Sequence, residues 1–235
     1  MGTIVNVAFI IMGSLIGSLL KKGIQEKYRM AINNAVGLAV CVIGMYGIIT
    51  SGITIENNTL KSHYELLIVI SLILGVLIGE KLNFDDKLNN LSYKIEKRFK
   101  LTGFAKSFIT GSLIYCVGAM AIVGSINDGL LNDPSILYVK AILDGVTSII
   151  LAATMGIGVI FSAIPVLIYQ GSLTLLSSYL SEVLQGDLLS QLCVLGYILV
   201  LCLGLNFLKI TKLKVANFLF ALLIPIIYYV ITLFF

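Results

Sequence analysis

The sequence predicts an all-α fold: a polytopic membrane helix bundle with about eight transmembrane helices. Apolar residues make up 58% of the 235 residues and charged residues only 12%, whereas a soluble domain carries about twice that charged share. Apolar segments long enough to cross a bilayer, which takes about 20 residues, recur along the whole chain. Basic residues gather in a few of the connections between them. We therefore expect one integral membrane domain over residues 1–235.

Eight apolar segments are candidate spans. They cover residues 3–20, 31–53, 65–79, 104–126, 136–155, 157–180, 188–208 and 215–234. The uninterrupted region 136–180 is too long for one span. The motif TMGIG at 154–158 supplies the break, because glycine enters turns at little cost. In the sixth span we expect Pro165 to disrupt the helix and to free backbone carbonyls.

The basic residues orient these spans. Four follow the first span, seven follow the third and three follow the seventh, out of 16 in the chain. Eight spans place all of these on one side, which the positive-inside rule makes cytoplasmic. We therefore expect a multi-pass protein of the bacterial inner (plasma) membrane with both termini outside.

The segment 82–100, LNFDDKLNNLSYKIEKRFK, differs from the spans. Leu82, Leu88, Leu91, Ile95 and Phe99 recur at helical spacing among charges. This pattern favours an amphipathic helix on the inner membrane face, between the third and fourth spans. A solvated connector is the alternative.

Internal similarity suggests hairpin repeats. GSLIG at 13–17 matches GVLIG at 75–79, and each leads into a basic loop. In the spans that follow, CVIGM at 41–45 matches CVGAM at 116–120. Duplication is common in transporters, although glycine-rich apolar helices can also converge on similar sequences.

Two opposite charges stand one helical turn apart in the fifth span. A charge at the bilayer centre costs roughly 2.5–3.5 kcal/mol. Lys140 can extend its long stem toward the surface, whereas Asp144 lies about 12 Å into a core of about 30 Å. Two interpretations stay open. The pair could only hold helices together, or Asp144 could face a polar cavity and bind a cation or carry a proton, with Lys140 as tether or competitor.

Other polar residues lie at depths that suit a solute or ion site. They are Ser148, one turn below Asp144, Ser125, Asn127 and Asp128 at the end of the fourth span, and Tyr169 and Gln170 after Pro165. Each alone is more often a helix–helix hydrogen bond than a ligand contact.

Several functional classes lack their sequence signals. The chain has no P-loop, no H-E-x-x-H and no G-x-S-x-G motif. It has one histidine and four cysteines without a C-x-x-C pair, so we expect no metal site and no cofactor. We also expect no enzymatic activity. The basic loops are short and adjoin the spans, so nucleic-acid binding is not needed to explain them.

Three long motifs resemble one family of bacterial membrane proteins, the YdfK/YqgA-like proteins, which are described as a domain of unknown function and as putative transport proteins. The motifs are CVGAMAIVGSINDGL (116–130), ILDGVTSIILAATMGIGVIFSAIPVLIYQGSLTLL (142–176) and GLNFLKITKLKVANFLFALL (204–223). The likeness covers essentially the whole chain. It implies a membrane location and supplies no binding residues.

The sequence favours a secondary transporter of a small cationic or zwitterionic solute, which could be coupled to protons through Asp144. Two alternatives remain: a passive ion or solute channel lined by Ser, Thr and Asn, and a non-transporting membrane scaffold that docks partners through 82–100. The expected partners are the lipid bilayer and a small solute or ion, with a homodimer as one possible assembly.

Overall fold

The computed structural model describes residues 1–21, 26–56, 59–87, 90, 94, 103–117, 119–180 and 186–234. These residues are almost all helical, which confirms the all-α class. One element was not expected. Strands β1 (Ile53–Glu56) and β2 (Thr59–Ser62) form an antiparallel hairpin directly after the second predicted span. Its first strand is rich in β-branched residues, which favour extended backbone.

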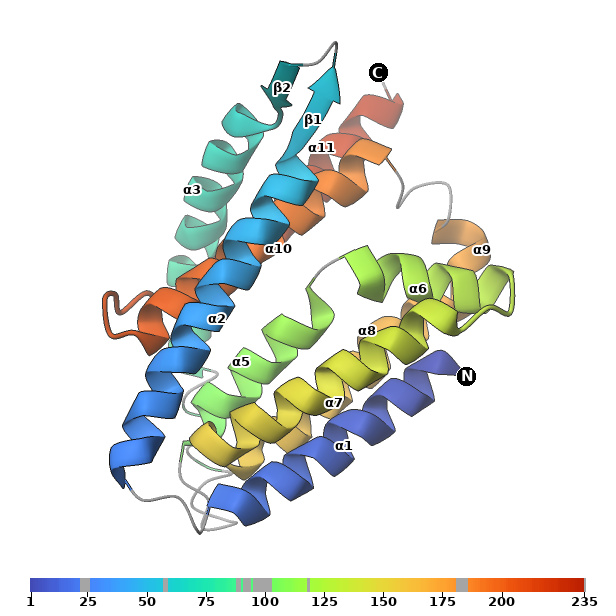
Figure 1. Ribbon diagram of the computed structural model, residues 1–235. Coiled ribbons are helices and arrows are strands. Elements are labelled where there is room, and N and C mark those ends of the chain that lie inside the picture. The colour runs from blue at the N-terminus through green and yellow to red at the C-terminus, as the bar shows by residue number, and fades with distance from the viewer. Residues whose placement is uncertain are drawn as a thin grey trace. The chain divides into compact units, whose positions relative to one another are not determined.

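The chain divides into two compact units (Figure 1). Unit 1 comprises Met1–Val36 and Leu88–Val183, and unit 2 comprises Gly37–Lys87 and Leu184–Phe235. Each unit therefore combines an early and a late part of the sequence. The single membrane domain over 1–235 stays a prediction.

Unit 1 is a bundle of helices that come from two stretches of chain. Its described elements are α1 (Gly2–Lys21), α5 (Phe104–Cys116), α6 (Ala119–Leu130), α7 (Ser135–Met155), the 3-10 helix η1 (Ile157–Ser162), α8 (Ala163–Leu175) and α9 (Ser177–Leu180). Figure 1 shows α1 and α7 side by side, and the order of their contacts shows that the two helices are parallel.

Glycines bring α1 and α7 into close contact. A Cβ on Gly13 would lie 2.3 Å from the carbonyl oxygen of Gly145, and one on Gly17 would lie 2.2 Å from that of Ile149. No side chain fits in either position without moving the helices. This close approach of two backbones is typical of helix pairs packed in lipid.

One predicted span in unit 1 is broken by a bend, and another changes helix type along its length. The fourth consists of α5 and α6, which are bent by 59° relative to each other. The sixth begins as η1 and continues as α8, after Gly156 with φ 108° has ended α7 at the predicted break. The expected disruption at Pro165 is wrong. Pro165 is the third residue of α8, which follows η1 without a gap, so the helix continues through Pro165 although its missing N–H removes one helical hydrogen bond.

Unit 2 has the same kinds of element. It contains most of α2 (Glu26–Gly52), the hairpin β1–β2, α3 (Glu65–Leu82), α10 (Gly186–Phe207), the 3-10 helix η2 (Val215–Leu222) and α11 (Leu223–Phe234). Pro225 is the third residue of α11, so in both units a 3-10 helix leads into an α-helix with proline in its first turn.

Glycines also set the packing of α3 on η2. A Cβ on Gly75 would lie 2.4 Å from the backbone nitrogen of Ala221, and one on Gly79 would lie 2.2 Å from the carbonyl oxygen of Asn217. The matching motifs GSLIG and GVLIG thus serve the same purpose, each at a helix crossing within its own unit. Whether they descend from a duplication stays a prediction.

The described helices suit a bilayer. Six are long and apolar enough to cross it, or seven when α5 and α6 count as one bent span. The third predicted span, α3, is not among them because it carries charges in its first and last turns. The pattern of exposure is that of a membrane protein. Large apolar side chains such as Ile4, Leu19 and Leu143 are exposed, while polar ones lie inside.

The predicted amphipathic segment 82–100 falls mostly outside the described residues. Within it, α3 continues to Leu82, Asn83 adopts a left-handed conformation with φ 49°, and 84–87 are helical. Phe84 packs edge-on against Phe220 of η2 at 5.3 Å between ring centroids.

Candidate ligand-binding site

A polar cluster lies inside unit 1. It is formed by Asn6 of α1, Lys140 and Asp144 of α7, and Gln170 of α8. Asn6 and Gln170 are fully buried, and Lys140 and Asp144 are 5% and 7% exposed. The charged pair of the fifth span is therefore buried among helices and does not face the lipid.

Direct hydrogen bonds join the four residues. Asn6 Nδ2 donates to Asp144 Oδ2 at 3.0 Å and to Gln170 Oε1 at 3.2 Å. Lys140 Nζ also donates to Asp144 Oδ2, with which it forms an ion pair. Among the described residues, both hydrogen bonds to the carboxylate thus end on the same oxygen.

Local structure explains why these residues meet. Lys140 and Asp144 are four residues apart on α7, so they share one face of the helix. Asn6 lies seven residues before Gly13 and so occupies the same face of α1 as the glycine crossing. Because Gly13 lets α1 approach α7 closely, the short amide of Asn6 can reach the carboxylate.

The break between α5 and α6 lies near this cluster. Cys116, the last residue of α5, is within electrostatic range of both Lys140 and Asp144. Beside it, Tyr115 is fully buried, and its hydroxyl lies 2.7 Å from Ser148 Oγ on α7. The bend in the fourth span and the charge pair are therefore neighbours.

A pocket opens at the end of unit 1 where α1 begins. Its volume is about 530 Å³, which falls within the range of roughly 300–1,000 Å³ that is usual for small-molecule sites. Its lining includes Met1, Asp128, Asn132, Tyr138 and Thr174. Neither Lys140 nor Asp144 is part of this lining, so the charge pair is closed off from the pocket in this conformation.

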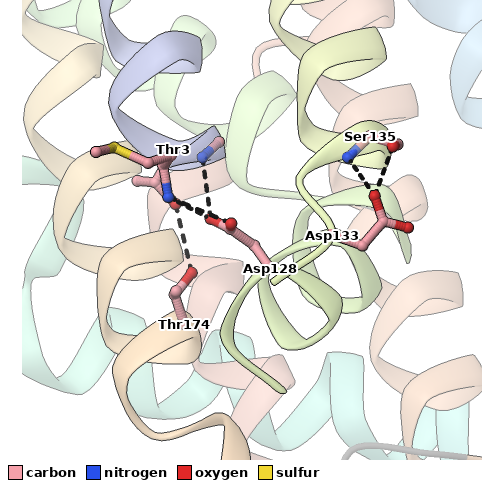
Figure 2. A network of polar contacts seen from close by, with 7 residues as sticks. Thr3, Asp128, Asp133, Ser135 and Thr174 are labelled. Atoms are coloured by element: carbon pink, nitrogen blue, oxygen red, sulfur yellow. Dashed lines mark hydrogen bonds and ion pairs between the residues drawn. The ribbon is translucent and has the colours of Figure 1, made fainter. Parts of the chain in front are cut away.

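Asp128 is the acidic group of that pocket. Figure 2 shows its carboxylate turned toward the start of α1, where it accepts hydrogen bonds from the Met1 amine at 3.0 and 3.2 Å and from Gly2 N–H at 3.0 Å. The carboxylate is 5% exposed. Asp128 therefore ties the first turn of α1 to the end of α6.

A pair of threonines lies one helical turn from the cluster along α1 and α8, and one of them, Thr174, also lines the pocket. Thr3 precedes Asn6 by three residues, and Thr174 follows Gln170 by four, so each is one helical turn away. Thr3 Oγ1 and Thr174 Oγ1 lie 3.5 Å apart (Figure 2). The two helices are thus bridged by polar pairs at two successive levels.

Asp133 also lies at this end of the unit, in the loop before α7. Its Oδ1 accepts hydrogen bonds from the hydroxyl of Ser135 at 2.5 Å and from the Ser135 backbone N–H at 3.0 Å (Figure 2). These bonds hold the pKa of Asp133 below its usual value. The side chain is exposed and makes no described contact with the cluster.

The structure brings together part of the predicted site. Lys140, Asp144 and Gln170 are joined through Asn6, whereas Asp128 belongs to the pocket and Ser148 bonds to Tyr115. The remaining three predicted residues have other surroundings. Ser125 is buried with no described partner for its hydroxyl, Asn127 is half-buried and accepts through its backbone oxygen from Leu131 and Asp133, and Tyr169 is half-buried on α8.

Asn6, Thr3 and Thr174 were not among the predicted site residues. Asn6 is the only carboxamide in the first span, which was a usable signal. The threonines carried none, because single threonines are common in membrane helices and bond to their own backbone. Within the described residues, no group of three or more His, Cys, Asp or Glu side chains could hold a metal ion.

The apolar helices and the buried charges define a class of protein: an integral, multi-pass membrane protein. The family follows from comparison with known sequences. Residues 1–230 match the family model described as "Protein of unknown function (DUF554)", and the chain belongs to that family.

Two relatives are similar over nearly the whole chain. The "Uncharacterized membrane protein YdfK" of Bacillus subtilis (strain 168) is 34% identical over 95% of this chain and 93% of its own length. The "Uncharacterized protein YqgA" of Escherichia coli (strain K12) is 27% identical over the same shares of the two chains. No solved structure matches.

Proposed function

We propose that this protein is a secondary transporter of a small cationic or zwitterionic solute, and that Asp144 is its cation-binding group. It acts in the lipid bilayer on a small solute or ion, without a cofactor, a nucleic-acid partner or an enzymatic step. The observation that carries the proposal is the buried, hydrogen-bonded cluster of Asn6, Lys140, Asp144 and Gln170.

Burial of this cluster is costly in a membrane. Removing the two charges of an ion pair from water costs several kcal/mol of desolvation free energy per charge. Ionisable residues inside spans commonly mark solute or ion paths. A purely structural pair would be expected to satisfy its partners fully. Here two amide atoms, Asn6 Oδ1 and Gln170 Nε2, are buried with no partner among the described residues.

The surroundings supply the other parts that a carrier needs. The pocket at Asp128 begins about one turn beyond the cluster along α8, at Thr174, which also contacts Thr3 of α1. The bent α5–α6 span adjoins the charge pair. Discontinuous helices next to a mid-membrane site are common in transporters, where they change conformation as access alternates.

Flux measurements in proteoliposomes test this proposal. Wild-type protein is compared with Asp144→Asn and with the matched control Asp133→Asn, which removes an exposed acid of the same unit. We expect saturable uptake of a cationic or zwitterionic solute that Asp144→Asn abolishes and Asp133→Asn preserves. Flux that does not saturate would indicate a channel. No Asp144-dependent flux of any ion, amine or amino acid would refute transport and favour a scaffold.

A further inference from the structure

The four cluster residues leave a defined set of hydrogen-bonding groups unused. Both N–H bonds of Asn6 Nδ2 are taken, by Asp144 Oδ2 and Gln170 Oε1. The acceptors on both sides fix the orientation of this amide, since a flipped Asn6 would turn its oxygen toward two other oxygens. Asn6 Oδ1 is therefore left as an acceptor and Gln170 Nε2 as a donor, and both are buried.

The carboxylate adds a second acceptor. Asp144 Oδ2 accepts hydrogen bonds from Lys140 Nζ and Asn6 Nδ2, and Asp144 Oδ1 has no described hydrogen bond. Because Asn6 is hydrogen-bonded to both Asp144 and Gln170, the unused donor and acceptor groups of these residues belong to one cluster. A ligand that completes it must donate to oxygens of Asn6 and Asp144 and accept from the amide nitrogen of Gln170.

Water or a neutral polar solute can donate and accept in this way, but neither matches the charges of Lys140 and Asp144. A metal ion or a proton cannot accept a hydrogen bond from Gln170, and a simple anion cannot donate to Asn6 and would be repelled by Asp144. A compound with an ammonium beside a carboxylate meets it on both sides. Its ammonium donates and matches the charge of Asp144, while its carboxylate accepts from Gln170 and matches the charge of Lys140.

Building on the proposed transport function, we propose that this cluster binds a small zwitterion of the amino-acid class. The ammonium of Lys140 takes the place of the ligand's ammonium on Asp144 when the site is empty. On binding, the ligand's ammonium displaces Lys140 Nζ from Asp144 Oδ2, and Lys140 moves to the ligand's carboxylate. The net charge buried in the cluster stays unchanged, because a neutral zwitterion joins a neutral pair.

Binding to the purified full-length protein in detergent tests this inference. The twenty common amino acids are tried singly by thermal shift, since a ligand that binds only the folded state raises its stability. The best binder is then compared with the amine that lacks its carboxylate and with the acid that lacks its ammonium. We expect each fragment to bind about tenfold more weakly or worse, because each loses charge-assisted hydrogen bonds.

Substitution of the donor provides a second arm. Gln170→Met removes the amide nitrogen while nearly keeping the side-chain volume, and Gln191→Met, at a mostly buried glutamine of unit 2, is the matched control. We expect Gln170→Met to bind the amino acid no better than its amine, and Gln191→Met to discriminate as the wild type does.

The outcomes separate this inference from the proposed function. The proposal that the ligand is a zwitterion is overturned if the amine binds as tightly as its amino acid. It is also overturned if no amino acid binds. Asp144-dependent cation flux would survive either result, and a bridging water would then complete the cluster. If flux is also absent, both proposals fail.

Discussion

Adding one methyl group at Gly13 tests how closely α1 and α7 must approach. The new Cβ would lie 2.3 Å from the carbonyl oxygen of Gly145 and 3.0 Å from the Cβ of Ser148. Ordinary van der Waals contact begins at 3.4 Å, so Gly13→Ala must move α1 and α7 apart by about 1 Å at this point. Overpacking of this kind typically costs about 1–3 kcal/mol.

Gly171→Ala is the matched control for this substitution. Gly171 lies in α8 of the same unit, and a Cβ there would meet nothing within 4 Å. Both variants gain about 1 kcal/mol of helix propensity, since alanine is the better helix former. The difference between them therefore isolates the clash, which we expect to be about 1–3 kcal/mol.

Thermal unfolding in one detergent measures this difference. For a chain of this length, 1 kcal/mol corresponds to roughly 2–4 °C in Tm, so we expect Gly13→Ala to unfold about 2–12 °C below Gly171→Ala. Gly13→Ala should also weaken the Asn6–Asp144 bond, because both contacts lie on the same face of α1. Equal Tm values for the two variants would refute the close crossing and the placement of Asn6 that depends on it.

Three further predictions concern the charge pair, the end of α3 and the response to acid. Lys140→Met should destabilise the protein by about 3–5 kcal/mol, because it leaves a buried carboxylate unpaired. The double substitution Lys140→Met with Asp144→Leu should recover most of that loss. If Lys140→Met alone left the Tm unchanged in thermal unfolding, the pair would not be buried. Asn217→Leu should cost about 1–3 kcal/mol, because Asn217 Nδ2 donates to Glu80 at 2.8 Å and its Oδ1 accepts from Asp85 N–H at 2.8 Å; unchanged unfolding in denaturant would contradict this. Asp133 has a lowered pKa because Ser135 donates to its carboxylate, so its contribution is present above the unfolded pKa of about 3.9 and is lost as pH falls through the lower folded value. Asp133→Asn should therefore flatten the acid side of the Tm–pH profile. An unchanged slope there would contradict a stabilising role for the Asp133 carboxylate.

Span positions could be predicted well from the sequence. The predicted span 136–155 is α7 (Ser135–Met155), and the predicted 215–234 is η2 together with α11 (Val215–Phe234). Apolar length is a local property, and Gly156, with its positive φ, marks the turn after α7 as the TMGIG motif predicted. The bend between α5 and α6 was not predicted, because the apolar run 104–126 contains no proline and no charge after Lys106.

The candidate site could be predicted only in part. Lys140 and Asp144 stood out because charges are rare inside spans. Their partner Asn6 lies 138 residues from Asp144 in the sequence, and a contact at that separation depends on how the helices pack. The division into two units likewise follows from packing, since each unit draws on distant segments of the chain.

The central claim is that the cluster of Asn6, Lys140, Asp144 and Gln170 receives a ligand. An experimental structure, determined with the tightest-binding amino acid at saturating concentration, tests it most directly. The account predicts ligand density within hydrogen-bonding distance of Asn6 Oδ1 and Gln170 Nε2, with Lys140 Nζ displaced from Asp144. Ligand found only in the pocket at Asp128, with Lys140 still paired to Asp144, would contradict the claim.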